Sequence, residues 1–357
     1  MSSQMSSVEL SIITVTWNSA AYLGPYLTAL RQHLADIAYE VFVVDNASSD
    51  ETVPWLREHG FTPLRPQNMT PGTLPSAQYL LIANKTNLGF AAANNVGLRL
   101  ARGTFVFFLN PDTEIQPESV QRLLAFLRAH PDVVAVGPKL TRPDGAIQGG
   151  AAGHEPSLCT LLHYSLGLYR LSPRLFPGLW LPRKQYTSPR PIEVDWISGA
   201  ALLTRTSIAR RVGGWPEEYF LYGEDMAFCR RLRKYGRIVC LPEAHVVHHI
   251  GGSTRQIGHV GIARNIIALD QDYRARFSAP KVALLHLMGA LGFGLRWAFA
   301  LGKGDHIPQG HSVPARELWR VCTLTSLQCA WQALRGEPPP AVSPEFRSHR
   351  QFAAKDR

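Results

Sequence analysis

The stretch that decides the fold is Val41-Phe42-Val43-Val44-Asp45-Asn46-Ala47-Ser48-Ser49-Asp50, an apolar run that ends abruptly in polar residues. Four consecutive apolar residues that are mostly β-branched are typical of a strand buried on both faces. Ser48 and Glu51 have the spacing of a capping box, so a helix is expected to begin beside them. The stretch therefore predicts a buried strand, a polar turn at Asp45 and a following helix.

The alternation of strand and helix continues on both sides of this stretch. Apolar runs typical of strands occupy residues 10–15, 79–83 and 104–109. Helical spacing of apolar residues occupies residues 23–30, 88–100 and 117–127. This order predicts an α/β fold with a mostly parallel central sheet and helices on both faces. Ligands bind such sheets beyond the carboxyl ends of the strands, where Asp45 and Asp112 lie.

The composition narrows the class of protein. Of 357 residues, 45% are hydrophobic and 18% are charged, so a sizeable core is expected. The formal net charge of +10 suits a polyanionic partner such as nucleic acid, an anionic bilayer or a phosphorylated substrate. No recognition helix accompanies the basic residues, which argues against nucleic acid. The first strand continues as Thr14-Val15-Thr16-Trp17-Asn18 without a GxGxxG loop, which argues against a dinucleotide-binding oxidoreductase.

The cysteines and the N-terminal residues indicate a cytoplasmic protein. The five cysteines are scattered and form no CxxC pair, so we expect them to be reduced. Residues 1–9 lack a basic segment followed by an apolar core, so no export is expected.

Three polar motifs follow the predicted strands. Asn110-Pro111-Asp112 offers oxygen ligands for a hard cation such as Mg²⁺ or Mn²⁺, although an ordinary Asn-Pro turn explains it equally well. His248 precedes a glycine loop and can bind a metal or a phosphate, or be an ordinary surface histidine. The carboxylate of Asp45 can accept hydrogen bonds from a nucleobase or ribose, or can cap the next helix.

Glu224 and Asp225 open a predicted helix that has basic residues toward its other end. The helix dipole alone explains this order of charges. The preceding residues 220–223 are aromatic and apolar, however, so the two acids would lie on a surface from which water is partly excluded. Such a setting suits a general base that takes a proton from a hydroxyl group. Structure and catalysis remain equal alternatives here.

The order of these motifs resembles that of family 2 glycosyltransferases of the GT-A fold, and within them the rhamnosyltransferase-like branch. The resemblance covers about residues 10–255. The motifs that carry it are Thr16-Trp17-Asn18, Val43-Val44-Asp45-Asn46-Ala47-Ser48-Ser49-Asp50, Asn87-Leu88-Gly89-Phe90 with Asn94-Asn95, Leu109-Asn110-Pro111-Asp112, Trp196-Ile197-Ser198-Gly199-Ala200, Gly213-Gly214-Trp215, Tyr222-Gly223-Glu224-Asp225 and residues 248–253.

The resemblance implies roles for particular residues. Asp225 would be the general base, and Glu224 would orient it or the acceptor. Asp112 would bind a divalent cation, Mg²⁺ or Mn²⁺, with His248 completing the site. The implied donor-binding residues are Thr16, Asn18, Asp45, Lys85, Asn87 and Asn110, and the implied acceptor-binding residues are Trp196, Gly199 and Ala200. The chain departs from the family pattern at Trp215-Pro216-Glu217, where Phe-Asp-Glu is frequent, and at Ala227, where a second Asp is frequent.

The implied activity is inverting transfer of a sugar, rhamnose from dTDP-rhamnose, onto a lipid-linked or saccharide acceptor in cell-surface polysaccharide synthesis. The expected partners are a nucleotide-sugar donor, a saccharide or polyprenyl-diphosphate-linked acceptor and a membrane surface. Transfer from another UDP- or dTDP-hexose is one alternative. A non-catalytic protein that binds sugar nucleotides is the other, and the retained Asp112 and Asp225 argue against it.

The C-terminal third is expected to form a separate, membrane-associating helical appendage. We predict a GT-A domain over residues 1–278 with an insertion at 151–191 near the acceptor side, a helical segment over 279–336 and a disordered tail over 337–357. Residues 281–302 are apolar apart from His286 and Arg296. Burying Arg296 in a bilayer is costly, so an in-plane helix is expected, with Lys281, Arg296 and Lys303 near the headgroups. A helix packed in a small subdomain is the alternative. The expected localisation is cytoplasmic, peripheral on the inner face of the cytoplasmic membrane.

Overall fold

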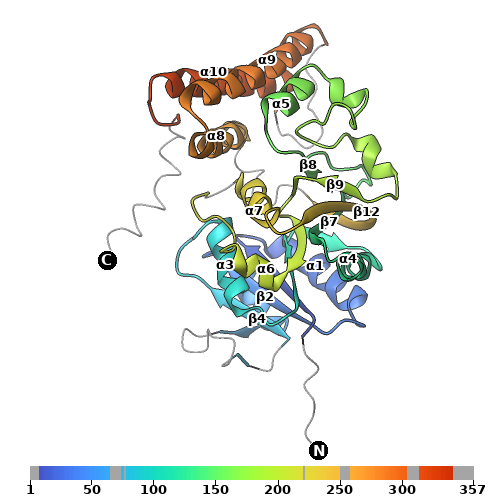
Figure 1. Cartoon of the computed structure of the whole chain (residues 1–357). Coiled ribbons are helices and arrows are strands. Elements are labelled where there is room, and N and C mark those ends of the chain that lie inside the picture. Colours follow the sequence, from blue (N-terminus) through green and yellow to red (C-terminus); the bar gives the residue numbers. More distant parts are fainter. Residues whose placement is uncertain are drawn as a thin grey trace, which may run out of the picture. The chain divides into compact units, whose positions relative to one another are not determined.

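The computed structural model describes residues 8–64, 74–75, 78–219, 222–249, 258–303 and 313–340. The chain divides into two compact units (Figure 1). Unit 1 comprises Met1–Gly153, Arg183–Phe220 and Glu224–Gly252, and unit 2 comprises His154–Pro182, Leu221–Gly223 and Ser253–Arg357. These divisions differ from the predicted boundary after residue 278. Most of the predicted tail, residues 341–357, lies outside the described residues.

The first half of the unit 1 sheet is parallel, and its central strands are buried. It has the strand order β3-β4-β2-β1-β5. The strands are β1 (Leu10–Thr16), β2 (Tyr39–Asp45), β3 (Thr62–Pro63), β4 (Tyr79–Ala83) and β5 (Phe105–Leu109). The connecting helices are α1 (Ala20–His33), α2 (Thr52–Glu58) and α3 (Phe90–Leu100). Every residue of β2 and β5 is buried, as expected for strands covered by helices on both faces.

The second half of the sheet is mixed. The order continues β5-β11-β7-β12-β6, with β9 also paired to β12. The strands are β6 (Thr113–Ile115), β7 (Val133–Thr141), β9 (Ile192–Val194), β11 (Ala201–Arg205) and β12 (Arg237–His248), and β8 (Ala152–Gly153) pairs separately with β10 (Trp196–Ile197). The helices are α4 (Ser119–Ala129), α6 (Thr206–Arg211) and α7 (Glu224–Leu232), with a short 3₁₀ helix η4 (Arg183–Thr187). The predicted α/β architecture with a mostly parallel sheet is confirmed.

The strand directions collect several chain segments at one edge of the sheet. The parallel strands β1, β2 and β4 end side by side, with Thr16 paired to Asp45 and Asp45 paired to Ala83. Strand β11 runs against β5 and pairs Ala201 with Leu109, so the residues before β11 reach the edge where β5 ends. Strands β7 and β12 run in the direction of β5, so β12 also ends at this edge.

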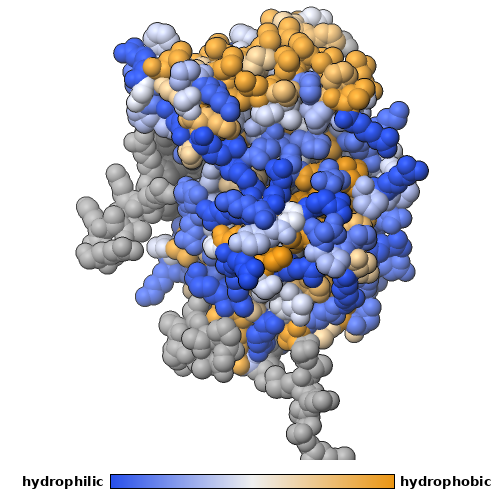
Figure 2. Space-filling model, viewed as in Figure 1, coloured by the Kyte–Doolittle hydropathy of each residue, from blue (hydrophilic) through white to orange (hydrophobic). Residues whose placement is uncertain are grey.

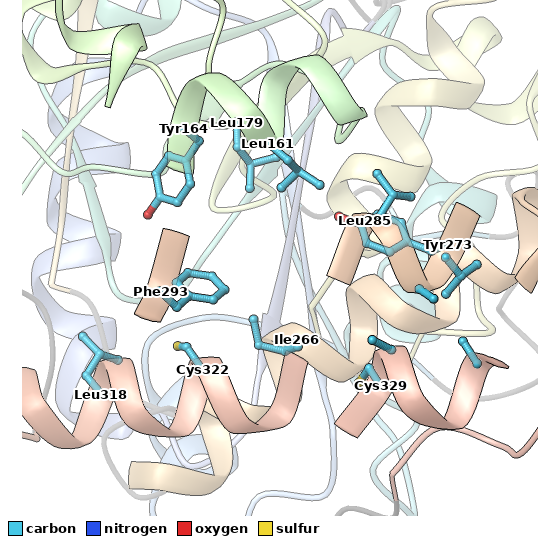
Figure 3. Close-up of a cluster of buried hydrophobic side chains, with 14 of the residues drawn as sticks. Leu161, Tyr164, Leu179, Ile266, Tyr273, Leu285, Phe293, Leu318, Cys322 and Cys329 are labelled. Carbon is cyan, nitrogen blue, oxygen red and sulfur yellow. The ribbon is translucent and has the colours of Figure 1, made fainter. Parts of the chain in front are cut away.

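Unit 2 is a bundle of helices around its own apolar core. Its helices are α5 (Leu158–Ser165), η3 (Leu168–Arg170), α8 (Gly258–Arg276), α9 (Ala279–Lys303) and α10 (Ala315–Leu334). Figure 3 shows Leu161 and Tyr164 of α5, Ile266 and Tyr273 of α8, Leu285 and Phe293 of α9, and Leu318, Cys322 and Cys329 of α10 facing one another. The first part of the predicted insertion, His154–Pro182, therefore belongs with the C-terminal helices.

Candidate active site

Asp45 lies buried at the end of β2, where it binds the neighbouring loop. Its Oδ1 accepts hydrogen bonds from Thr16 Oγ1 at 2.8 Å and from Ser48 Oγ at 2.5 Å. Its Oδ2 accepts from the backbone N–H of Ser48 at 2.9 Å. The residue is 1% exposed, so the carboxylate turns inward and fixes the turn after β2. The predicted contact with a base or ribose stays a prediction.

The loops after β1 and β2 are tied together at Asn18. Its φ of 51° is in the left-handed region, which asparagine tolerates better than most residues. The side-chain Oδ1 accepts from Ser49 N at 2.8 Å, and the Asn18 N–H donates to Ser48 Oγ at 2.8 Å. Asn18 therefore shapes the rim beside Thr16 and Asp45.

A chain of asparagines holds the loop between β4 and α3. Asn84 donates to Asn46 Oδ1 at 3.0 Å, and Asn46 donates to the carbonyl of Gly89 at 3.1 Å. The predicted donor residue Asn87 accepts from Gly89 N at 2.9 Å, and the predicted Lys85 is exposed. The sequence does not indicate the roles of Asn46 and Asn84, because these roles depend on contacts between separate loops.

Asp112 and His248, predicted to share a metal site, lie together. Asp112 Oδ1 is 3.2 Å from His248 Nε2, and both residues are 9% exposed. Antiparallel pairing of β6 with β12 sets this approach, because Thr113 pairs with His248. The other ring nitrogen, His248 Nδ1, contacts Gln148 Oε1 at 2.9 Å. Gln148 was not singled out from the sequence.

These contacts fit a divalent cation. Both nitrogens of His248 face oxygen acceptors, and a neutral imidazole can donate to only one of them. If Nδ1–H donates to Gln148, the lone pair of Nε2 is directed toward the carboxylate of Asp112, and a cation between them satisfies both. Two adjacent ligands of an octahedral Mg²⁺, each about 2.1 Å from the ion, lie about 3 Å apart. The Asp112–His248 distance matches that spacing.

The residues just before β11 connect the Asp112–His248 pair to the other strand ends at this edge of the sheet. Asn110 N donates to the carbonyl of Ala200 at 3.0 Å, so the predicted metal motif and acceptor motif touch. A Cβ on Gly199 would lie 3.0 Å from the indole ring of Trp215 and 3.1 Å from the ring of Phe90. Glycine therefore fits where a larger residue would be crowded. The predicted acceptor residue Trp196 is 5% exposed within β10.

Glu224 and Asp225 lie at the first turn of α7, beside Gly199. The Asp225 carboxylate accepts from the backbone N–H of Gly199 and, through Oδ1, from Met226 N at 2.8 Å. Burial raises the pKa of Asp225 above its ordinary value. Burial, and then the charge of Asp225, raises the pKa of Glu224 to about 8. Perturbed carboxyl groups of this kind are frequent at catalytic sites.

Two buried polar atoms near Gly199 have no hydrogen-bond partner in the part of the chain that the structure describes. They are Glu224 Oε2 and the indole Nε1 of Trp215. Trp215 stacks on Phe228 of α7 with ring centroids 4.5 Å apart, so the indole and the acids share one wall. Buried polar groups normally have partners, so this wall is suited to a polar ligand or ordered water.

The sheet edge therefore brings together most of the predicted site residues. Thr16 and Asp45 end adjacent strands, Asn110 contacts Ala200, Asp112 contacts His248, and Gly199 contacts Asp225. Lys85 is exposed on the loop after β4, and Trp196 is buried behind the edge. Residues 250–253 of the predicted motif lie outside the described residues.

A second group of possible metal ligands lies in unit 2. Atoms of Asp270, His286 and Cys329 lie within 4.8 Å of one another, and all three residues are buried. Asp270 Oδ2 already accepts from Arg274 Nε at 2.6 Å, and Oδ1 contacts His286 Nε2 at 2.9 Å. Because the guanidinium neutralises the carboxylate, this group is better explained as a network that joins α8, α9 and α10.

A mostly parallel sheet with polar groups gathered at one edge agrees with the GT-A fold that the sequence predicts. Residues 11–154 match the model of glycosyl transferase family 2. The predicted resemblance to family 2 glycosyltransferases is confirmed over these residues, and the chain is also similar to a rhamnosyltransferase.

Two curated relatives and one solved structure illustrate the similarity. N-acetylglucosaminyl-diphospho-decaprenol L-rhamnosyltransferase of Mycobacterium tuberculosis is 29% identical over 257 residues, which cover 69% of this chain and 77% of the relative. Low-salt glycan biosynthesis hexosyltransferase Agl10 of Haloferax volcanii is 25% identical over 230 residues, covering 63% and 62%. The crystal structure of GalNAc-T7 with UDP, GalNAc and Mn²⁺ aligns with a TM-score of 0.50 at 12% identity, covering 95% of this chain and 60% of that one, which supports the fold alone.

Proposed function

We propose that this glycosyltransferase moves rhamnose from dTDP-rhamnose onto a lipid-linked or saccharide acceptor with inversion at the anomeric carbon. One observation carries the proposal: the Asp112–His248 pair and the buried Asp225 meet at one sheet edge. The backbone of Asn110, just before Asp112, bonds to Ala200, and the neighbouring Gly199 N–H bonds to Asp225. This arrangement can hold a donor diphosphate on one side and an acceptor hydroxyl on the other.

In the proposed reaction Asp225 acts as the general base. It removes the proton from the acceptor hydroxyl as that oxygen attacks the anomeric carbon, and general base catalysis of this kind contributes about 10²–10⁴-fold to rate. The hydrogen bond from Gly199 N–H holds the carboxylate in place. The raised pKa keeps Glu224 largely protonated near neutral pH, so it orients groups through hydrogen bonds while Asp225 carries the charge.

Asp112 and His248 are the proposed ligands of a divalent cation, Mg²⁺ or Mn²⁺. Such an ion neutralises charge on a departing diphosphate. Gln148 fixes the ring of His248 through Nδ1, which presents Nε2 toward Asp112. Thr16, Asn18, Asp45, Lys85, Asn87 and Asn110 are the proposed donor-side residues, and Trp196, Gly199 and Ala200 the proposed acceptor-side residues.

The names of relatives support the choice of donor and acceptor. The mycobacterial relative is named as an L-rhamnosyltransferase that acts on a diphospho-decaprenol acceptor. By analogy we propose a polyprenyl-diphosphate-linked saccharide as acceptor, in cell-surface polysaccharide synthesis, and a cytoplasmic enzyme peripheral on the inner face of the membrane. Transfer from another UDP- or dTDP-hexose is the alternative for the donor.

A transfer assay with a panel of nucleotide sugars, Mn²⁺ and a short-chain lipid-linked acceptor tests the proposal. We expect turnover with dTDP-rhamnose and a product of inverted anomeric configuration by NMR. The Asp225→Asn variant should bind the nucleotide sugar normally by calorimetry but lose transfer by about 10²–10⁴-fold. The Asp112→Ala variant should lose the metal-dependent part of binding. Transfer at the wild-type rate by the first variant would remove the base assignment, and binding without transfer or donor hydrolysis by the wild type would favour a non-catalytic protein.

A further inference from the structure

Helix α9 is apolar on both of its faces. Its inner face contributes Val282, Leu285 and Phe293 to the core of unit 2. Its outer face carries a stripe of residues at helical spacing that are 44% to 66% exposed: Leu284, Leu287, Leu291, Leu295 and Phe299. By length and composition, Ala279–Gly302 could cross a membrane, and 39% of its most apolar window is buried inside the protein.

The two polar residues that interrupt α9 turn inward, which corrects the expected placement of Arg296 near headgroups. Arg296 donates to the carbonyls of Gly292 at 2.7 Å and Tyr164 at 2.8 Å. His286 contacts Asp270 at 2.9 Å. Within residues 282–302 every exposed side chain is therefore apolar. The helix therefore lacks the polar outer face that is usual for a helix of a soluble protein.

Neighbouring segments of unit 2 extend the apolar surface. Helix α10 exposes Leu324, Leu327, Trp331 and Leu334 at spacings of three and four residues. The segment after α5 contains Leu171 and Leu175, which are 79% and 74% exposed. Figure 2 shows apolar residues gathered over α9, α10 and α5. Monomeric soluble proteins rarely expose a continuous apolar surface of this extent, so it is expected to be covered.

The charges of unit 2 favour a bilayer as the occupant. Its described residues contain eleven Lys and Arg against five Asp and Glu. Arg170 and Arg174 are exposed and alternate with the exposed Leu171 and Leu175, and the exposed Lys281 begins α9. Exposed basic residues beside an apolar face complement anionic lipids. A second copy of the chain would instead bring basic residues of like charge together.

The chemistry of the exposed side chains also favours a bilayer over a protein partner. Protein interfaces average about one hydrogen bond per 100–200 Å². The exposed leucines and Phe299 offer no polar atom for such bonds. Trp331, which is 60% exposed on α10, has the amphipathic ring that is enriched at the membrane–water boundary.

We propose that the outer surfaces of α9 and α10, with Leu171 and Leu175, form a platform that lies in the plane of an anionic bilayer. The purpose of the platform, which is to meet a lipid-linked acceptor, rests on the proposed function. Its binding to a bilayer does not. An in-plane position follows from the inner face of α9, because His286 and Arg296 are paired within the protein there and a spanning helix would have to release them.

Vesicle flotation tests the platform without any need for activity. The probe is a vesicle of phosphatidylcholine with roughly one-third phosphatidylglycerol. The double variant Leu291→Gln, Leu295→Gln replaces two half-exposed side chains without adding charge. Each loss is expected to weaken partition about tenfold, so the pair should weaken it about 100-fold. The control is Tyr235→Gln in unit 1, a similarly exposed residue whose replacement should leave partition unchanged.

Other outcomes separate the alternatives. Equal flotation of wild type and the double variant, with unchanged thermal unfolding, would overturn the platform. So would a wild-type dimer in light scattering that the double variant converts to monomer without any vesicle binding. Resistance to alkaline carbonate would indicate a spanning helix and overturn the in-plane position. Transfer to a soluble acceptor should be unchanged in the double variant, so loss of flotation with retained transfer supports the platform and leaves the proposed reaction intact.

Discussion

Replacing Glu224 with Gln is expected to stabilise the protein at neutral pH. Glu224 is 7% exposed, its Oε2 has no partner among the described residues, and Asp225 is its neighbour. Burial is the larger cause and the charge of Asp225 the second cause of its raised pKa. Gln has nearly the same shape and no charge, so the substitution removes the titration and leaves the packing in place.

The magnitude follows from the pKa change. The ordinary pKa of 4.5 rises to about 8 in the folded protein. Because the folded state binds the proton more tightly than the unfolded state, the protonated carboxyl contributes stability that is fully present below pH 4.5. This stability is lost as the pH rises through about 8. At pH 7 the folded carboxyl is mostly protonated while the unfolded one is ionised, which costs about 3 kcal/mol at about 1.4 kcal/mol per pH unit. The Gln variant lacks this loss.

Denaturant unfolding followed by tryptophan fluorescence measures the difference. The free energy of unfolding of the Gln variant, relative to wild type, should rise by about 3 kcal/mol between about pH 4.5 and pH 7. Metal and nucleotide are omitted, because a bound cation would alter the titration. The matched control is Glu218→Gln, an acid with 63% of its side chain exposed. Parallel pH curves for wild type and the Glu224 variant would refute the reasoning.

Three further outcomes follow from single contacts. Gln148→Leu should weaken Mn²⁺ binding in the presence of nucleotide about 10–100-fold by calorimetry, because the imidazole of His248 loses the acceptor that orients it. The control Gln121→Leu replaces a glutamine that bonds to His33 and should leave Mn²⁺ binding unchanged. Gly199→Ala should cost about 1–3 kcal/mol of unfolding free energy through crowding against the neighbouring indole, and should lower kcat with little change in nucleotide affinity. Thr16→Val should cost about 1.5–3 kcal/mol in denaturant unfolding, because the buried carboxylate of Asp45 loses a donor.

The strands and their polar ends could be predicted because each depends on a few neighbouring residues. The run at residues 79–83 gave β4 with the observed bounds, and residues 104–109 gave β5 to within one residue. The pairing of Asp112 with His248 was expected from the family resemblance, because neither motif by itself indicated the other as its partner. The antiparallel direction of β11 was not predicted, because a short apolar run carries no signal of its direction.

The remaining features depend on contacts between distant segments. Gln148 is 100 residues from His248, and its segment has no periodic pattern. The inward turn of Arg296 could not be foreseen because α9 is apolar all round, so its spacing does not say which face is buried. The packing of α9 against α5, α8 and α10 separates the two faces, and the carbonyl of Tyr164 in α5 accepts from Arg296.

The reversal of β11 explains how the proposed base and the proposed metal ligands reach the same place. A parallel strand beside β5 would begin at the opposite edge, and the residues before it would lie far from Asp112. Because β11 runs against β5, Gly199 and Ala200 precede it at the edge where β5 ends. The carbonyl of Ala200 then fixes Asn110, and the N–H of Gly199 fixes Asp225. Two adjacent peptide groups thus set the separation between the proposed leaving-group side and the proposed proton acceptor.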